Sequence, residues 1–387
     1  SGSIVALLTS KYPTTTRVLY PPNILRAQDS YQHLPGILKT LGYYTVQMGF
    51  EVYVDAYNLN LLSGFDEVNG RSYLGSNYFD QIKNYLPGES AYFFYETFNR
   101  IFDRLRHIFF IHTMENAFEQ VTTVSESFSD LEKLNKLFAL LETKDQPVFV
   151  HIHWMGTHGA KFYAIEQKFS GDKQRELQND WDMDFYDDSI YEVDQIVKSI
   201  YEKLETEGKA KNSIIVIGSD HGQNYLTNVR VPLFIHFPNG EHAGRIFLNA
   251  QNMDIAPTLL DYLGQTIPVW MEGDTLLDGL VNQRPILAAG VGKSTVEDGF
   301  AVVDNAALKP PFYQFGYFSL IDCDRWYKLS VVDGISFQKG KIDFYDTTCT
   351  NSPMTDQEVL QRFVEHLKEK EFDTSTLEEW IAKYSTP

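Results

Sequence analysis

Short apolar runs alternate with amphipathic segments along the first 280 residues. Residues 43–47, 146–153 and 212–218 have the length and the β-branched, aromatic character of buried strands. Residues 189–204 instead repeat apolar side chains at helical spacing, which predicts one apolar helix face; these are Ile190, Val193, Ile196, Val197, Ile200 and Leu204. Strands joined by a helix and short connections favour parallel pairing with right-handed crossovers.

Further segments extend the same alternation. Residues 32–41 read as a helix that stops at Gly42, and residues 254–263 as a helix that stops at Gly264. A buried run at 231–237 adds a strand. The pattern therefore predicts an α/β domain over residues 1–280, built as a three-layer α/β/α sandwich with a mostly parallel central sheet.

The pattern changes after about residue 280. Residues 326–332 and 341–345 look like antiparallel strands, and an acidic helix follows at 356–369. We therefore expect a small C-terminal α+β subdomain over residues 281–387. Within the first domain, the Phe- and Arg-rich run 93–112 predicts a helical insertion over the site.

Charge and cysteine content limit the binding partners and the cellular compartments that are compatible with the sequence. With 33 basic and 52 acidic residues the net charge is −19, which opposes binding to nucleic acid or to an anionic membrane surface. No apolar run is long enough for a transmembrane helix. Cys323 and Cys349 are the only cysteines, and they leave two alternatives open: one disulfide in an oxidising compartment, or two core thiols. The sequence opens at Ser1 without a methionine, so we expect that an upstream segment has been removed.

Candidate chemistry lies where the strand at 212–218 ends. There Asp220 and His221 stand side by side in Ser-Asp-His-Gly, residues 219–222. Ligands bind outside the carboxyl ends of strands in open α/β sheets, and Asp with His suits a borderline divalent metal. The alternative is an Asx-type turn after the strand, with His221 uninvolved.

A second polar segment follows the strand at 146–153. His151 and His153 share one face of the strand, while His158 lies in the loop Gly-Thr-His-Gly. Loops at strand ends carry function, so we assign a role to His158 and interpret His151 as structural. At the chain's beginning, the hydroxyls of Ser1, Ser3 and Thr9 suit an anionic ester at a helix N-terminus, unless Ser1 and Ser3 merely cap that helix.

One phosphate-loop look-alike is rejected. The run Gly290-Val-Gly-Lys-Ser-Thr295 resembles the end of a phosphate-binding loop, but the position of its first glycine holds Leu287. We therefore exclude an NTPase.

Taken together, the segments resemble the sulfatase and phosphoethanolamine-transferase branch of the alkaline phosphatase superfamily. The motifs that carry the resemblance follow the family's order: Leu7-Leu-Thr-Ser-Lys-Tyr-Pro13, Leu41-Gly-Tyr-Tyr-Thr45, His153-Trp-Met-Gly-Thr-His-Gly159, Tyr186-Asp-Asp-Ser-Ile-Tyr-Glu-Val-Asp194, Ser219-Asp-His-Gly222, Val231-Pro-Leu233, Asp254-Ile-Ala-Pro-Thr-Leu-Leu260 and Glu272-Gly-Asp-Thr-Leu276. The resemblance implies a metal-dependent hydrolase or transferase that acts on a sulfate or phosphate ester through a covalent intermediate.

The resemblance also assigns roles. Asp220 and His221 would be ligands of one divalent ion (Ca²⁺, Mn²⁺ or Zn²⁺), and His158, Lys161 and Ser3 would bind the substrate. The nucleophile would lie just before Ser1. The implied partner is a small anionic ester, a glycan or a lipid headgroup, handled outside the cytoplasm. Nucleic acid is excluded, and a membrane would be reached only through an upstream segment.

Departures from the family pattern support a different hypothesis. The position of the family's motif arginine holds Ile4, the Gly-Lys-x-His run reads Gly49-Phe-Glu-Val52, and the usual glutamate is Gln223. These losses remove positive charge that would stabilise a bound sulfate ester. The alternative is therefore a catalytically inactive sulfatase-like domain with a binding or structural role.

Overall fold

The computed structural model describes most of the chain. The described residues are 2–21, 23–50, 53–72, 128–222, 229–277, 284–292, 294–297, 300–303, 310–342, 349 and 352–384, with isolated positions between 85 and 105. The helical insertion predicted at 93–112 lies largely outside them.

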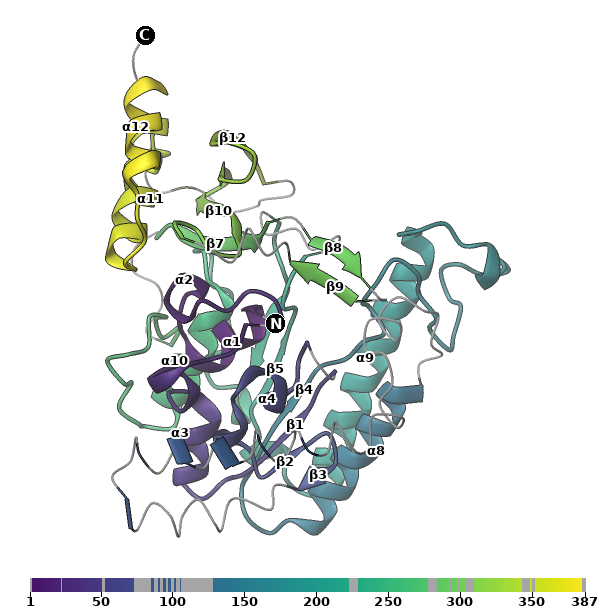
Figure 1. Cartoon of the computed structure of the whole chain (residues 1–387). Helices are drawn as coiled ribbons and strands as arrows, with labels where there is room; N and C mark the ends of the chain where they lie inside the picture. The colour runs from purple at the N-terminus through teal and green to yellow at the C-terminus, as the bar shows by residue number, and fades with distance from the viewer. Residues whose placement is uncertain are drawn as a thin grey trace.

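A mostly parallel sheet forms the middle of the first domain (Figure 1). Its order is β3-β2-β1-β4, with β1 Tyr44–Met48, β2 Glu67–Val68, β3 Arg71–Ser72 and β4 Val148–Ile152. Strand β1 pairs in parallel with both β2 and β4, and only the short β3 is antiparallel. This confirms the predicted parallel pairing and places the carboxyl ends of β1 and β4 at one edge.

Helices cover both faces of this sheet. Side chains of β4 alternate between the faces: Val148, Val150 and Ile152 pack with α8 and α9, whereas Phe149 packs on the opposite side. One layer holds α8 Phe128–Thr143 and α9 Met183–Thr206; the other holds α1 Gly2–Thr9, α3 Leu34–Thr40, α4 Ala56–Leu59 and α10 Ile255–Tyr262. The predicted three-layer sandwich is thus confirmed.

Helix ends follow local signals. Helix α9 begins at Met183, earlier than the predicted 189, because the Asp182 side chain accepts the Asp184 N–H (3.1 Å) and caps it there. Gly208 and Gly264 follow α9 and α10 with φ of 67° and 65°, a conformation that favours glycine. Among the elements whose bounds the structure describes, the remaining short helices are α2 Pro13–Thr16, η1 Ala27–Ser30, η2 Leu62–Gly64, η4 Arg175–Leu177, η5 Ala210–Asn212, η7 Pro238–Gly240 and η8 Asn252–Asp254.

Strands β5 (Ile215–Gly218) and β6 (Leu233–His236) pair antiparallel, as neighbouring strands can when no crossover helix joins them. Strand β5 still belongs to the sandwich, since Ile215 packs with the α8–α9 layer and Val216 with the α3–α10 layer. Within the described residues β4 and β5 thus lie between the same helix layers, although no ladder of hydrogen bonds joins them.

The C-terminal part is an antiparallel sheet covered by two helices. Its order is β12-β11-β10-β7, with β7 Ile286–Val291, β10 Phe315–Asp322, β11 Arg325–Ser330 and β12 Ser336–Lys341; β8 Ser294–Glu297 and β9 Phe300–Val303 form a separate hairpin. Helix α11 Asp356–Glu369 has the predicted bounds, and α12 Ser375–Tyr384 follows it. Strand β12 ends at Lys341, and most of the strand predicted at 341–345 lies outside the described residues. A domain boundary near residue 280 stays a prediction.

The phosphate-loop look-alike at 290–295 leads from β7 into β8, so no helix begins there as a phosphate loop requires. None of the described helices is long and apolar enough to cross a membrane.

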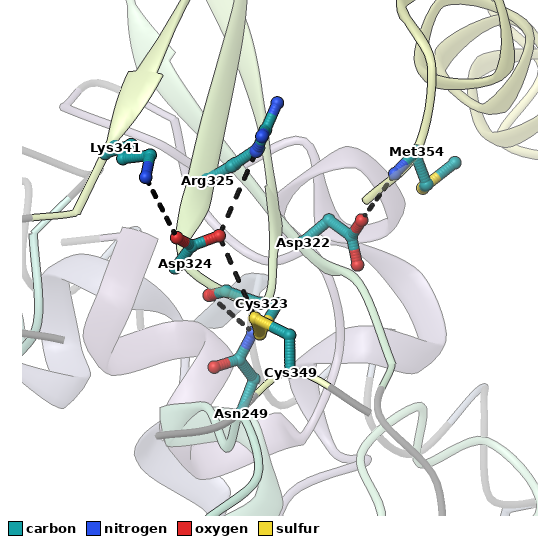
Figure 2. Close-up of a disulfide and its surroundings, with 8 residues drawn as sticks. All are labelled: Asn249, Asp322, Cys323, Asp324, Arg325, Lys341, Cys349 and Met354. Carbon is teal, nitrogen blue, oxygen red and sulfur yellow. Dashed lines mark hydrogen bonds and ion pairs between the residues drawn. A yellow bond between two sulfur atoms is a disulfide. The ribbon is translucent and has the colours of Figure 1, made fainter. Parts of the chain in front are cut away.

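A disulfide fastens the β10–β11 hairpin (Figure 2). Cys323, in the turn of the hairpin, is bonded to Cys349, with 5.7 Å between their Cα atoms. On the same hairpin the Asp322 carboxylate accepts the Met354 N–H (2.9 Å), just before α11. Of the two alternatives left open by the sequence, the structure has the disulfide.

Candidate active site

The loop after β5 is held by its own polar groups. Ser219 Oγ donates to the His221 carbonyl (2.6 Å), and Asn252 Nδ2 donates to the Ser219 carbonyl (2.8 Å). These bonds tie residues 219–222 to η8, the short helix that leads into α10. The loop therefore presents Asp220 and His221 in a fixed direction at the carboxyl end of β5.

Asp220 and His221 point to a shared space. Asp220 Oδ1 lies 3.7 Å from His221 Nε2, and His221 Nδ1 lies 2.9 Å from the Gly222 carbonyl oxygen. Because a carbonyl oxygen only accepts, this hydrogen bond places the proton of a neutral imidazole on Nδ1. Nε2 then carries the lone pair, and it lies close enough to the Asp220 carboxylate for both groups to bind one cation.

His158 joins this pair, as the sequence predicted. Its ring centroid lies 5.6 Å from that of His221, and the rings meet edge to face. The His158 N–H donates to the Met155 carbonyl (2.9 Å), which closes the turn after β4. Burial and, to a smaller extent, the neighbouring His221 lower the pKa of His158 to about 4, while the Asp220 carboxylate acts in the opposite direction.

Two further histidines lie beneath the site. Burial lowers the pKa of His153 to about 3 and that of His151 to about 4, with the Asp220 carboxylate acting in the opposite direction on both. Burial also works against ionisation of Asp220, but the fields of His153 and His221 outweigh it, so the pKa of Asp220 lies below its ordinary value. His151 Nδ1 also lies 3.3 Å from the amide Nε2 of Gln47 on β1, in agreement with its structural interpretation.

A carboxylate and an ammonium group on α8 hold the loop that carries His158. The buried Asp130 accepts the N–H groups of Met155 and Gly156 (2.9 Å each). Lys133 Nζ donates to Asp130 (2.9 Å) and to the His153 carbonyl (2.8 Å). Neither residue could be assigned to the site from the sequence, because contacts between positions about 25 residues apart carry no local signal. The local pattern shows only two opposite charges three residues apart on a helix.

A cavity of about 1300 Å³ opens beside the pair. Asp220 and His221 line it together with Gly2 and Ser3 from the start of α1. The predicted substrate residue Ser3 is thereby brought to the same space as the predicted metal ligands. The cavity exceeds the roughly 300–1,000 Å³ typical of small-molecule sites.

Two other predicted residues have different neighbours. Lys161 donates to the Gln178 carbonyl and lies 3.4 Å from Asp180, and it is not among the described residues that line the cavity. Thr9 is buried and donates to the Val5 carbonyl (2.7 Å) within its own helix. A role of Lys161 in substrate binding stays a prediction.

The Asp220 carboxylate and the His221 imidazole provide part of the ligand set that a divalent metal needs. Ligand bonds to Ca²⁺, Mn²⁺ or Zn²⁺ are about 2.0–2.6 Å long, so two donor atoms 3.7 Å apart can share one ion. Among the described residues, no third His, Asp or Glu gathers with Asp220 and His221 closely enough to complete a site. The group that does gather, Cys323, Asp324 and Cys349, has its sulfurs in the disulfide and offers no thiolate.

Comparison with known proteins agrees with this geometry. The chain is 27% identical over 190 residues to N-acetylglucosamine-6-O-sulfatase of Bacteroides thetaiotaomicron, which covers 44% of this chain and 33% of that protein. It is 32% identical over 115 residues to an arylsulfatase of Clostridium perfringens, covering 26% and 24% of the two chains. The matches thus span a third or less of these relatives.

Solved structures share the fold at low identity. A Bacteroides thetaiotaomicron protein from work on glycosaminoglycan metabolism has a TM-score of 0.61 at 16% identity, over 97% of this chain and 85% of that one. Phosphonate monoester hydrolase of Silicibacter pomeroyi has a TM-score of 0.54 at 13% identity, over 96% and 86%. A protein in complex with its substrate D-glucosamine-2-N,6-O-disulfate has a TM-score of 0.55 at 14% identity, over 97% and 89%.

A family model described as Sulfatase matches residues 1–265. That span holds the central sheet, both helix layers and the residues Ser3, His158, Asp220 and His221. Since it covers more than half of the 387 residues, the chain belongs to the sulfatase family.

Proposed function

We propose that the protein cleaves or transfers the acid group of a sulfate or phosphate ester with the help of a divalent metal ion. One observation carries this proposal. The Asp220 carboxylate and the His221 Nε2 atom lie 3.7 Å apart at the carboxyl end of a strand, and both line a large cavity. Open α/β folds bind their ligands at this edge.

The described residues take separate roles. Asp220 and His221 hold the ion, and the depressed pKa of Asp220 keeps it in the carboxylate form that binds a cation. A bound ion would lower the pKa of the attacking hydroxyl and neutralise charge on the acid group. Ser3, which lines the cavity, donates a hydrogen bond to the acid group from α1. His158 is not among the described residues that line the cavity, and it acts through the His221 ring, 5.6 Å away, which it positions from the β4 side.

The reaction would proceed through a covalent enzyme intermediate. The attacking oxygen forms a bond to sulfur or phosphorus, the ester bond breaks, and the alcohol leaves with a proton. Water or a second alcohol then removes the acid group. No described residue is assigned as the nucleophile. A histidine ligand favours Mn²⁺ or Zn²⁺ over Ca²⁺.

A non-catalytic binding role is the second candidate, and a specific observation favours it. Ile4 occupies the position of the family's motif arginine and is buried in the core instead of facing an anion. The described residues also complete only two ligands of the proposed metal site. A domain of this kind would bind its anionic ligand without turning it over.

An esterase assay distinguishes the proposed catalytic function from the non-catalytic binding role. The protein, expressed from its complete gene, would be assayed on an aryl sulfate, a phosphate monoester and a phosphodiester, each with Ca²⁺, Mn²⁺ or Zn²⁺. We expect metal-dependent turnover that Asp220→Asn and His221→Gln reduce by at least about 100-fold. Asp145→Asn, an exposed residue before β4, is the matched control and should leave the rate unchanged. Equal rates in Asp220→Asn and Asp145→Asn would contradict the proposal.

We also propose that the protein acts outside the cytoplasm. The Cys323–Cys349 disulfide supports this location, because disulfides persist in oxidising compartments and are rare in the cytosol. A similar protein of Drosophila melanogaster, 30% identical over 109 residues, is named an extracellular sulfatase. Blocking free thiols in intact cells before lysis should leave both cysteines of the protein unlabelled. Labelling of both would contradict the proposed location.

A further inference from the structure

Residues 160–182, between His158 and α9, fold back on themselves like a hairpin and are called the projecting loop below. The two arms, residues 160–167 and 173–181, run antiparallel. Hydrogen bonds to backbone carbonyls join the arms: from Trp181 N–H to Ala160 (2.7 Å), from Gln178 Nε2 to Phe162 (3.0 Å), from Arg175 Nη2 to Ile165 (2.8 Å) and from Gln167 Nε2 to Lys173 (2.9 Å). The arms are thus tied to each other from the base of the loop to its tip.

Side chains of α9 fix the projecting loop in place. The Asp188 carboxylate, which is 1% exposed, accepts the Phe169 N–H (2.6 Å), the Ser170 N–H (3.3 Å) and the Ser170 hydroxyl (2.5 Å). Glu192 accepts the Ile165 N–H (3.0 Å). A buried carboxylate is costly unless it is hydrogen-bonded, so these bonds favour one conformation of the loop. A binding surface on the loop is therefore preformed, which lowers the cost of binding.

Large apolar side chains of this fixed loop face water. Ile165 and Leu177, on the two arms, are 68% and 74% exposed, and Phe169 at the tip is 51% exposed. The loop projects beyond the first turn of α9, away from the sheet (Figure 1). Exposed apolar side chains that gather on one element mark a site of contact with a protein or with a membrane.

The projecting loop has almost no net charge. It contains four basic residues (Lys161, Lys168, Lys173 and Arg175) and five acidic ones (Glu166, Asp172, Glu176, Asp180 and Asp182). The lysines have partners on the loop itself or on α9: Lys161 Nζ lies 3.4 Å from Asp180, Lys173 Nζ lies 2.6 Å from Asp184, and Lys168 Nζ lies 3.8 Å from the centroid of the Tyr191 ring. The loop therefore fits an uncharged partner better than a charged one.

These features favour an uncharged lipid surface as the partner. A second copy of the chain would bring another net charge of −19, which repels the first copy at long range. A different protein would need a groove that matches the projecting tip, whereas lipid headgroups accommodate an apolar tip without one. The net charge of the chain also opposes an anionic bilayer, so zwitterionic headgroups fit best.

We propose that the projecting loop docks the protein on a zwitterionic bilayer by inserting Ile165, Phe169 and Leu177 among the headgroups. The charged side chains of the loop stay in contact with water and limit the insertion to the headgroup region. This contact goes beyond the proposed function and does not depend on it, because binding requires neither a metal ion nor turnover. It also differs from the expectation that only an upstream segment reaches a membrane.

Flotation with phosphatidylcholine vesicles tests the docking. We expect the wild-type protein to float with the vesicles. Ile165→Ser/Leu177→Ser should bind at least about 30-fold more weakly, because burial of one large apolar side chain is worth roughly tenfold or more in affinity. Leu41→Ser/Val269→Ser removes two other exposed apolar side chains and is the matched control, which should bind as the wild type does. Equal Tm values of the three proteins exclude unfolding as the cause of a difference.

A fluorescent variant tests the insertion without removing apolar surface. In Phe169→Trp the indole emission should shift to shorter wavelength when phosphatidylcholine vesicles are added, by more than the emission of the wild-type tryptophans shifts. Vesicles that also contain phosphatidylglycerol should bind the protein more weakly. Added salt should reduce this difference, because salt screens the repulsion between the −19 charge and the anionic headgroups.

Several results would overturn the proposal. One is a wild-type protein that does not bind phosphatidylcholine vesicles, or binds only those with phosphatidylglycerol. Another is equal binding by Ile165→Ser/Leu177→Ser and by its control, or an indole emission in Phe169→Trp that vesicles leave unchanged. A dimer that ultracentrifugation detects without lipid, and that Ile165→Ser/Leu177→Ser loses, would assign the loop to a second copy of the chain instead.

Discussion

His33 is a fully buried histidine whose ring is fixed at the start of α3. Its Nδ1 atom accepts the Gly36 N–H (3.0 Å), which caps the helix. The proton of the neutral ring is therefore on Nε2, which lies 3.1 Å from Ser63 Oγ and donates to it. Burial lowers the pKa of His33 to about 4. A protonated His33 would lose the cap and place an unpaired charge in the core.

We predict that this residue makes stability fall in mild acid. The folded-state pKa of about 4 lies below the unfolded value of 6.5, so the unfolded chain binds more protons between these values. The contribution of neutral His33 is complete above about pH 6.5 and is lost as the pH falls toward 4, by about 3 kcal/mol. Urea unfolding at pH 7 and pH 5 measures this loss of stability in the wild type and in His33→Asn, a variant that keeps a capping side chain.

The expected result is a smaller pH dependence in His33→Asn than in the wild type. His242→Asn is the control, because His242 is exposed and its removal should leave the pH dependence as it was. An equal loss of stability between pH 7 and pH 5 in wild type and His33→Asn would contradict the assignment.

Among single residues, the sequence indicated which polar side chains the fold brings together, while their roles stay predictions. Asp220, His221 and His158 could be found because each follows a recognisable buried strand, and strand ends meet at one edge of a parallel sheet. Asp130 could not, since its contacts with Met155 and Gly156 join positions about 25 residues apart in the sequence. The orientation of His221 was also hidden, because it depends on one hydrogen bond to a backbone carbonyl.

At the scale of elements, the contact between α8 and the turn after β4 determines where His158 lies. Asp130 satisfies two backbone N–H groups of this turn and is itself paired with Lys133. We predict that Asp130→Ala destabilises the protein by about 2–4 kcal/mol, because it leaves two buried donors and an ammonium group without their acceptor. Urea unfolding measures this loss, with Asp145→Ala as the exposed control.

Hydrogen exchange of the backbone amides tests the same prediction locally, at the turn after β4. In Asp130→Ala the amides of Met155 and Gly156 should exchange faster, while those of β1 should change only by the global loss of stability. A uniform increase over the whole sheet would show that Asp130 supports the fold in general and does not position this turn.

The disulfide also acts at the scale of elements, because it joins the turn between β10 and β11 to Cys349. Cys323 and Cys349 are 26 residues apart in sequence, and a closed loop of this length stabilises a fold by about 3 kcal/mol in the chain-entropy model. We predict that Cys349→Ser lowers the free energy of unfolding by about this amount under oxidising conditions. A reducing agent should destabilise the wild type to a similar extent and leave the variant unaffected. An equal response of both proteins to the reductant would contradict the prediction.

Helices with a strong apolar period could be predicted from the sequence, whereas the pairing of the strands was harder to predict. The apolar stripe of α9 and the capping box of α11, with Thr355 and Glu358, are local patterns that tertiary packing did not override. The sequence gives no indication of the antiparallel pairing of β5 with β6, because two buried runs look alike whichever way they pair. Strand β12 was not predicted over residues 336–340, because its mostly exposed residues carry only a weak apolar signal.

For the whole molecule, the proposed metal site links ligand binding to the stability of the fold. Asp220 and His221 occupy the end of β5 in the folded chain, and an unfolded chain does not hold them 3.7 Å apart. A ligand that binds only the folded state stabilises it by RT ln(1 + [L]/Kd), or about 2.7 kcal/mol at a hundredfold excess over Kd. For a chain of 387 residues this corresponds to a rise in Tm of about 3 °C.

We therefore predict that Mn²⁺ or Zn²⁺ raises the Tm of the wild-type protein in a saturable manner, measured by calorimetry without any substrate. Asp220→Asn and His221→Gln should abolish the rise, because each removes one of the two close donors, whereas Asp145→Asn should retain it. The −19 charge of the chain attracts cations everywhere, so a weak, non-saturating rise in all four proteins would reflect surface binding alone. A rise of the same size and the same midpoint in wild type and Asp220→Asn would place the ion elsewhere and remove the main support for metal-assisted ester cleavage at this site.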